Sequence, residues 1–220
     1  MVVLLSAAWP VWGWQQATSD HGVPLRWPKP PPMPVLMDPV PGVADGGAAA
    51  LAAAVSAWTA PDCTGLTFGE PELAGLATPT NAVTVAATPW PHEPGDAAFT
   101  VVDSNGPDGA IRGARIELNG VVRWADYGSA DAVDLQGLLV HEIGHMLGLG
   151  HSRIREATLY PGIRPGSVRG RTLNADDLAA LCTIYPAEPP PSEGSPWLLL
   201  LGPLGLLLGL VLAWRVLRGG

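Results

Sequence analysis

The segment from Leu138 to Ser152, "LLVHEIGHMLGLGHS", constrains the fold of this chain more than any other. It holds three of the chain's five histidines, at His141, His145 and His151. On a helix the first two imidazoles project from one face, a turn apart, and both reach one metal ion at about 2.0–2.1 Å. Gly148 can adopt the left-handed conformation that ends a helix, which would turn the chain back and bring His151 to the same ion. The segment therefore predicts a helix followed by a turn, built around a metal site.

Glu142 follows the first histidine and is rotated about 100° from it around the helix. Its carboxylate is therefore expected beside the ion rather than on it, where it can act as general base on a water molecule that the metal activates. Three protein ligands leave one position of a zinc ion open, which is typical of a catalytic site. Two alternatives remain open. The histidines can be an accidental match in a core helix, or the chain can be a catalytically silent, zinc-stabilised surface binding module.

The rest of the 220-residue chain has room for one compact domain with tails. Apolar and alanine-rich runs with helix start signals predict helices at 45–59, 131–149 and 174–185. β-rich runs separated by Gly, Pro, Asn and Asp predict strands at 35–38, 65–70, 81–88, 97–104 and 113–124. This order of elements predicts an α+β fold over residues 22–187. The formal charge of -8 and the lack of a cluster of basic residues argue against nucleic acid as a partner.

Both ends of the chain are apolar. Residues 1–21 resemble a secretory signal without its positive start, and a plain apolar tail is the alternative. Residues 188–196, rich in Pro, Ser and Gly, predict a stalk. Residues 197–214 carry no charge, have tryptophan at both ends and could cross roughly 27 Å of hydrocarbon as a helix. With the short basic tail at 215–220, they predict an exported domain that a C-terminal transmembrane helix anchors, with the tail in the cytoplasm.

The chain has two cysteines, Cys63 and Cys182, and both precede the predicted transmembrane helix. In an exported domain, an even pair predicts one disulfide that closes a very long loop. Two buried free thiols are the alternative.

The string "HEIGHMLGLGH" resembles the His-Glu-x-x-His-x-x-Gly-x-x-His signature of the metzincin metallopeptidases. With Ser152 after it and "ATLYP" at 157–161, it is most similar to the matrixin branch, which includes matrix metalloproteinases and their bacterial relatives. Weaker similarity in "LRWP", "SAWT", "LTF" and "ARIELN" extends the resemblance over roughly residues 24–186. The resemblance implies a zinc endopeptidase acting on protein or peptide substrates. It also implies a twisted, mostly parallel five-stranded sheet, two long helices and a small C-terminal subdomain with a closing helix. The substrate would lie along an edge strand near 97–102.

The sequence departs from this family at the methionine below the zinc, where it has Leu159. Leucine is apolar and of similar volume, so the floor of the site is expected to survive. No cysteine precedes the predicted disulfide pair, so latency through a propeptide cysteine on the zinc is not expected. Tyr160 is a candidate substrate-binding residue, with a packing role as the alternative. Asp126, Asp131 and Asp134 are candidates for a calcium site or for the cap of the helix that carries the histidines.

Overall fold

A computed structural model of the chain describes residues 12–29, 31, 35–36, 39–69, 81–86, 89–104 and 106–188. Its main sheet has four strands in the order β1-β2-β4-β3. Their bounds are β1 Val35–Leu36, β2 Ala82–Ala86, β3 Ala98–Asp103 and β4 Gly113–Asn119. The first three in this order are parallel, and β3 runs antiparallel to β4. The structure confirms a mostly parallel sheet and places β3 at its edge, where the sequence predicted the substrate strand.

The strand β4 shows how the sheet acquires a buried and an outer face. Ala114, Ile116 and Leu118 are buried, whereas Arg115 and Glu117 between them are partly exposed. This alternation follows from the two-residue period of a strand. The apolar side of the sheet therefore faces the helices, and the charged side faces outward.

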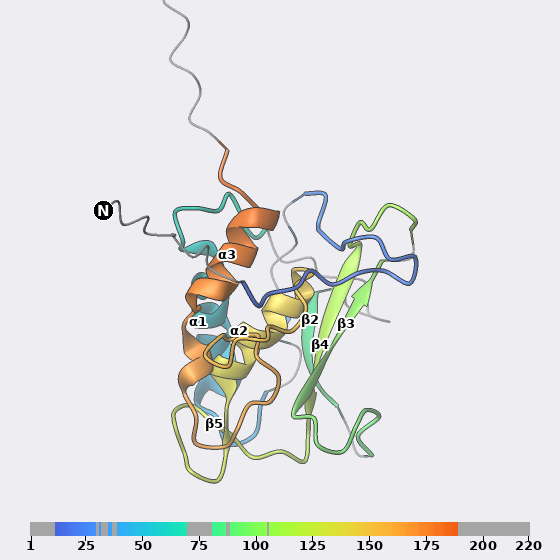
Figure 1. The fold of residues 1–220 in the computed structure, drawn as a ribbon. Coiled ribbons are helices and arrows are strands. Elements are labelled where there is room, and N and C mark those ends of the chain that lie inside the picture. Colours follow the sequence, from blue (N-terminus) through green and yellow to red (C-terminus); the bar gives the residue numbers. More distant parts are fainter. Residues whose placement is uncertain are drawn as a thin grey trace, which may run out of the picture. The chain divides into compact units, whose positions relative to one another are not determined.

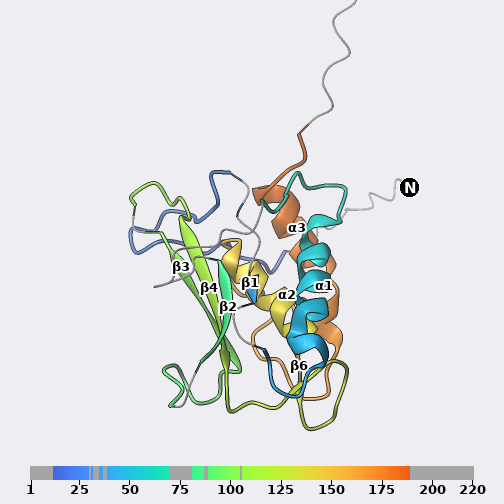
Figure 2. The same ribbon diagram turned by 180° about the vertical axis from the view of Figure 1, so that it is seen from behind.

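Two helices pack in succession on the sheet, and Figures 1 and 2 show them from opposite sides. The helix α2, Leu135–Met146, lies against β3 and β4. The helix α1, Ala48–Thr59, follows a 3-10 turn at Ala44–Gly47 (η1) and packs on α2. Trp58 of α1 is fully buried, and its indole Nε1 donates to the carbonyl of Val140 in α2 (2.8 Å). This bond fixes α1 to the back of the helix that carries the histidines.

The helix α2 begins four residues later than the sequence predicted. Val133–Asp134 form a short strand, β6, which pairs in parallel with β5, Trp124–Ala125. Asp134 is also the N-cap of α2, because its carboxylate accepts a hydrogen bond from Gly137 N (2.8 Å). The cap sets the first residue of the helix and therefore the position of the histidines along it.

The closing helix α3, Ala175–Ile184, follows a short 3-10 turn at Arg169–Arg171 (η2) and begins where the sequence predicted. Asn174 and Asp177 form a capping box, in which the side chain of each residue accepts a hydrogen bond from the backbone N–H of the other. The strand predicted at 65–70 is wrong over the described residues 65–69. Residues 65–68 lie in no strand, and Gly69 forms an isolated bridge, with its N donating to Pro31 O (2.8 Å).

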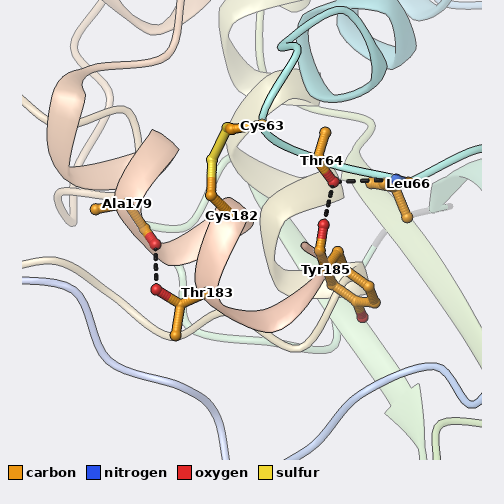
Figure 3. The surroundings of a disulfide bond; sticks show 7 residues. All are labelled: Cys63, Thr64, Leu66, Ala179, Cys182, Thr183 and Tyr185. Carbon is orange, nitrogen blue, oxygen red and sulfur yellow. Dashed lines mark hydrogen bonds between the residues drawn. A yellow bond between two sulfur atoms is a disulfide. The ribbon is translucent and has the colours of Figure 1, made fainter. Parts of the chain in front are cut away.

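Cys63 and Cys182 form the predicted disulfide, with their Cα atoms 5.4 Å apart. Figure 3 shows the bond between the segment after α1 and the last turns of α3. Beside it, Thr64 Oγ1 donates to the carbonyl of Tyr185 (2.6 Å). The disulfide therefore joins two segments that are 119 residues apart in the sequence.

Part of the predicted signal segment lies against the domain. Gly13 N donates to the buried Asp176 (2.7 Å), and Gln16 forms a bridge with Leu149. The boundary at residue 21 stays a prediction. No helix within the described residues is both long and apolar enough to cross a membrane. The span predicted at 197–214 lies outside the described residues, as do the tail at 215–220 and all but the first residue of the stalk.

Candidate active site

The three histidines of the motif converge at the C-terminal end of α2. His141 and His145 lie one helical turn apart, and their Nε2 atoms are 3.0 Å from each other. Gly148 has the predicted left-handed conformation, with φ of +86°, and a Cβ there would lie 2.5 Å from Leu25 O. The turn brings back His151, and one ligand nitrogen from each of the three imidazoles lies within 4.8 Å of the others. The structure thus confirms that the three side chains meet.

Hydrogen bonds to the backbone decide which ring nitrogens carry protons. The Nδ1 of His141 lies 2.7 Å from the carbonyl of Thr158, and the Nδ1 of His145 lies 2.8 Å from that of Leu149. A carbonyl only accepts, so both Nδ1 atoms must be the donors. Burial lowers the pKa of His141 to about 4 and that of His145 to about 4, so both rings are neutral at pH 7. Each Nε2 is therefore a bare acceptor.

Two bare acceptors that face each other across 3.0 Å have no proton between them to share. Such an arrangement is unfavourable unless a cation lies between the lone pairs. A tetrahedral zinc ion at about 2.0–2.1 Å from two nitrogens would hold them roughly 3.3 Å apart, close to the observed separation. Three neutral imidazoles also suit zinc as a donor set. The residues present therefore fit a zinc ion, with one coordination position left for a further ligand.

Glu142 lies beside this group and is not part of it, as its place on the helix predicted. Its side chain is buried, and Thr100 Oγ1 of β3 donates to its Oε2 (2.6 Å). Burial raises the pKa of Glu142, while His145 and the hydroxyl of Thr100 act in the opposite direction. The carboxylate is therefore held in one orientation and takes up a proton more readily than an exposed one.

Glu142 and the three histidines line one hollow of about 300 Å³. Its other walls are the segment from Gly95 to Thr100, Leu138 of α2, and the segment from Pro161 to Ile163. The hollow thus runs from the metal site to the edge strand β3. Since β3 is the edge strand of the described sheet, an extended peptide could pair with it and pass the metal site.

Comparison with known proteins places this geometry in a family. The sequence profile of Matrixin matches residues 86–186, just under half of the chain. Metalloendoproteinase 4-MMP of Arabidopsis thaliana is 40% identical over 79 residues, which are 34% of this chain and 23% of the relative. Residues 86–186, the part of the chain that carries the metal site, are matrixin-like.

Two further relatives of the matrixin domain come from distant organisms. Karilysin of Tannerella forsythia is 34% identical over 82 residues, or 36% of this chain and 16% of the relative. Human Matrilysin is 35% identical over 63 residues, which are 29% of this chain and 23% of the relative. In each case the alignment spans less than a quarter of the relative. The similarity therefore concerns the part around the site and not the whole of these proteins.

The floor of the matrixin site is built from Leu159, which is fully buried where the family has methionine. Asp177 of α3 holds this loop, because its carboxylate accepts from Thr158 N (2.7 Å) and Leu159 N (3.1 Å). Gly144, between the two helical ligands, leaves room for the loop. A Cβ there would lie 2.6 Å from Leu159 Cδ2 and 2.9 Å from Trp58 Cζ2.

The remaining candidates of the matrixin domain lie away from the histidines. Tyr160 is half-buried and lines a second hollow instead of the one that holds the metal ligands. Asp134 caps α2, which is one of the two uses predicted for it. Asp126 accepts from Ala44 N (3.0 Å), and Asp131 pairs with Arg123 (2.6 Å). Within the described residues these three carboxylates have protein partners and form no shared group for an ion.

Thr100 is the functional residue that sequence analysis missed. It lies in the predicted edge strand, but nothing in "AAFTVVDS" marks its hydroxyl as different from that of any other strand threonine. Its partner Glu142 is 42 residues away, and only the packing of α2 on β3 brings the two together. The alternation of the strand would have indicated the correct face, since Ala98 and Thr100 pair with the buried Leu118 and Ile116 of β4.

Proposed function

We propose that the chain is a zinc-dependent endopeptidase in which His141, His145 and His151 hold the ion and Glu142 is the general base. The observation that carries this proposal is the pair of bare Nε2 atoms facing each other beside a buried carboxylate. A closed structural metal site would have no use for that carboxylate. The names of the relatives support the same class of activity, since most are metalloendoproteinases.

A bound zinc ion would supply a lowered pKa for water and a polarised substrate carbonyl. The chain's own residues do the rest. Glu142 takes the proton of the attacking water and delivers it to the amine that leaves. Thr100 occupies Oε2 of that carboxylate, which leaves Oε1 free for the water. The peptide pairs with β3 and is held extended across the hollow.

The test compares zinc content and peptide cleavage for the parent, Glu142→Gln and His145→Ala. Glu156→Gln serves as a matched control, because Glu156 is exposed and lines neither hollow. We expect Glu142→Gln to keep one zinc per chain and to lose at least about 10²-fold in turnover, since an amide cannot accept the proton. His145→Ala should lose zinc.

Two outcomes would contradict the proposal. Equal cleavage by Glu142→Gln and the parent would show that Glu142 is not the base. If the parent protein binds zinc but cleaves no peptide in a broad library, the silent binding module would be favoured.

We also propose that the domain is exported and anchored to a membrane through residues 197–214. The uncharged run with tryptophans at its ends supports the anchor. The disulfide supports an oxidising compartment. Fractionation of cells that express the full chain, with external protease added to intact cells, tests both. A domain that is recovered in the cytosol, with reduced cysteines, would contradict them.

A further inference from the structure

A second hollow of about 380 Å³ lies next to the metal site and is lined by arginines. Arg155, Arg164 and Arg169 all contribute to its lining, together with Tyr160. The segment from Pro161 to Ile163 lines both hollows and is therefore their common wall. The second hollow therefore lies beside the metal-site hollow, next to where side chains of a bound peptide would be.

The three arginines form no ion pair with any carboxylate of the described residues. Within the described part of the chain, no carboxylate oxygen lies within 4.0 Å of any of them, whereas Arg171 nearby is paired with Asp134. The segment 153–171 carries five arginines and one acidic residue, Glu156, in a chain whose net charge is -8. A basic cluster therefore exists where the sequence as a whole indicated none.

Three like charges around one hollow repel one another, and an anion between them removes that cost. Arginine suits a carboxylate in particular, because its planar group donates two parallel hydrogen bonds. We propose that this hollow binds an acidic side chain of the substrate, so that the enzyme prefers peptides with Glu or Asp close to the cleaved bond. This specificity rests on the proposed endopeptidase function.

The experiment begins with a peptide library digested by the parent protein, with products read by mass spectrometry. A matched pair of peptides is then made that differs only by Glu against Gln at the most selective position. We expect the parent to cleave the Glu peptide about tenfold faster in kcat/KM, and we expect the ratio to fall in 0.5 M NaCl because salt screens exposed charges.

Arg164→Gln and Arg169→Gln should each lower the Glu/Gln ratio to about threefold, and the double variant should bring it near one. The readout is the Glu/Gln ratio, because any change in rate that the two peptides share cancels in it. Arg123→Gln is the matched control, since Arg123 is exposed on another loop and should leave the ratio unchanged. A ratio of one in the parent, or a ratio that survives both arginine changes, would overturn the inference.

A second measurement separates this inference from the proposed function. Fluorescence anisotropy with the Glu142→Gln protein compares labelled peptides of alternating Glu-Ala and Gln-Ala, so that no cleavage is needed. Tighter binding of the acidic peptide that Arg164→Gln and Arg169→Gln abolish supports the hollow even if no substrate is found. Equal binding of the two peptides contradicts it, while cleavage of neutral peptides would still support the endopeptidase.

Discussion

Replacing Arg171 with methionine should destabilise the domain by about 3–5 kcal/mol, because it leaves a buried carboxylate without its cation. The carboxylate belongs to Asp134, whose side chain is fully buried at the start of α2. Arg171 binds it through Nε (3.0 Å) and Nη2 (2.8 Å), and its Nη1 donates to Gln136 (2.6 Å). Without the guanidinium, the bond from Gly137 N (2.8 Å) remains, and it does not balance the charge.

Urea unfolding of five variants, Asp134→Asn alone among them, measures this cost. Arg171→Lys keeps the charge but loses the bidentate hydrogen bonds to Asp134, and should lower the free energy of unfolding by about 1–2 kcal/mol. Asp134→Asn with Arg171→Met removes both charges, so the double variant should be less destabilised than the sum of the single changes by at least about 1 kcal/mol. Arg123→Met, which breaks an exposed pair, should cost under about 1 kcal/mol. Additive single and double changes, or a cost for Arg171→Met as small as that of the control, would refute the argument.

Three further perturbations address the site and the outer surface. Thr100→Val removes the hydroxyl that bonds Glu142 and should lower kcat/KM by at least about tenfold, because a hydrogen bond to a charged group contributes about 1.5–3 kcal/mol. An unchanged rate would show that Thr100 does not orient this carboxylate. Burial raises the pKa of Glu117, but hydrogen bonds from His92 and Arg115 outweigh it and the net pKa lies below 4.5. Because the pKa of Glu117 is lower in the folded state, its ionised carboxylate stabilises the fold at pH values above the unfolded-state pKa. This stabilisation should be lost as the pH falls below about 4.5 and through the folded-state pKa. Urea unfolding of Glu117→Gln should therefore show a smaller loss of stability over this pH range. Serine at both cysteines should cost about 2–5 kcal/mol in the same assay.

The features that sequence analysis predicted correctly depend on residues close together in the chain. The spacing of the histidines at 141, 145 and 151 follows from the helical period and one glycine turn, so the metal group could be deduced from the sequence alone. The start of α3 was equally accessible, because Asn174 and the acidic residues of its first turn form a local cap. The pairing of Cys63 with Cys182 needed only that the chain have two cysteines and that export be expected.

The features that sequence analysis missed depend on contacts between distant segments. Whether Thr100 meets Glu142 is set by the register of β3 on β4, where Thr100 pairs with Ile116, and by the packing of α2 on that sheet. The start of α2 was misplaced because Asp134 is engaged by Arg171, 37 residues later, and lies in a strand. The second hollow needs a loop that brings three separated arginines, Arg155, Arg164 and Arg169, to its lining. No short-range pattern carries this information.

The leucine at position 159 clarifies what the floor of this site requires. Its loop orients a metal ligand through the backbone, since Thr158 O accepts from His141 Nδ1 (2.7 Å). Asp177 holds that backbone in place by bonding the amides of both loop residues. The side chain at 159 fills the space against Gly144, where the approach to the helix is too close for any Cβ. The ligand His141 is therefore oriented by a backbone carbonyl, and the side chain at 159 only has to fill an apolar space. Neither role needs the thioether of methionine, so leucine meets both requirements.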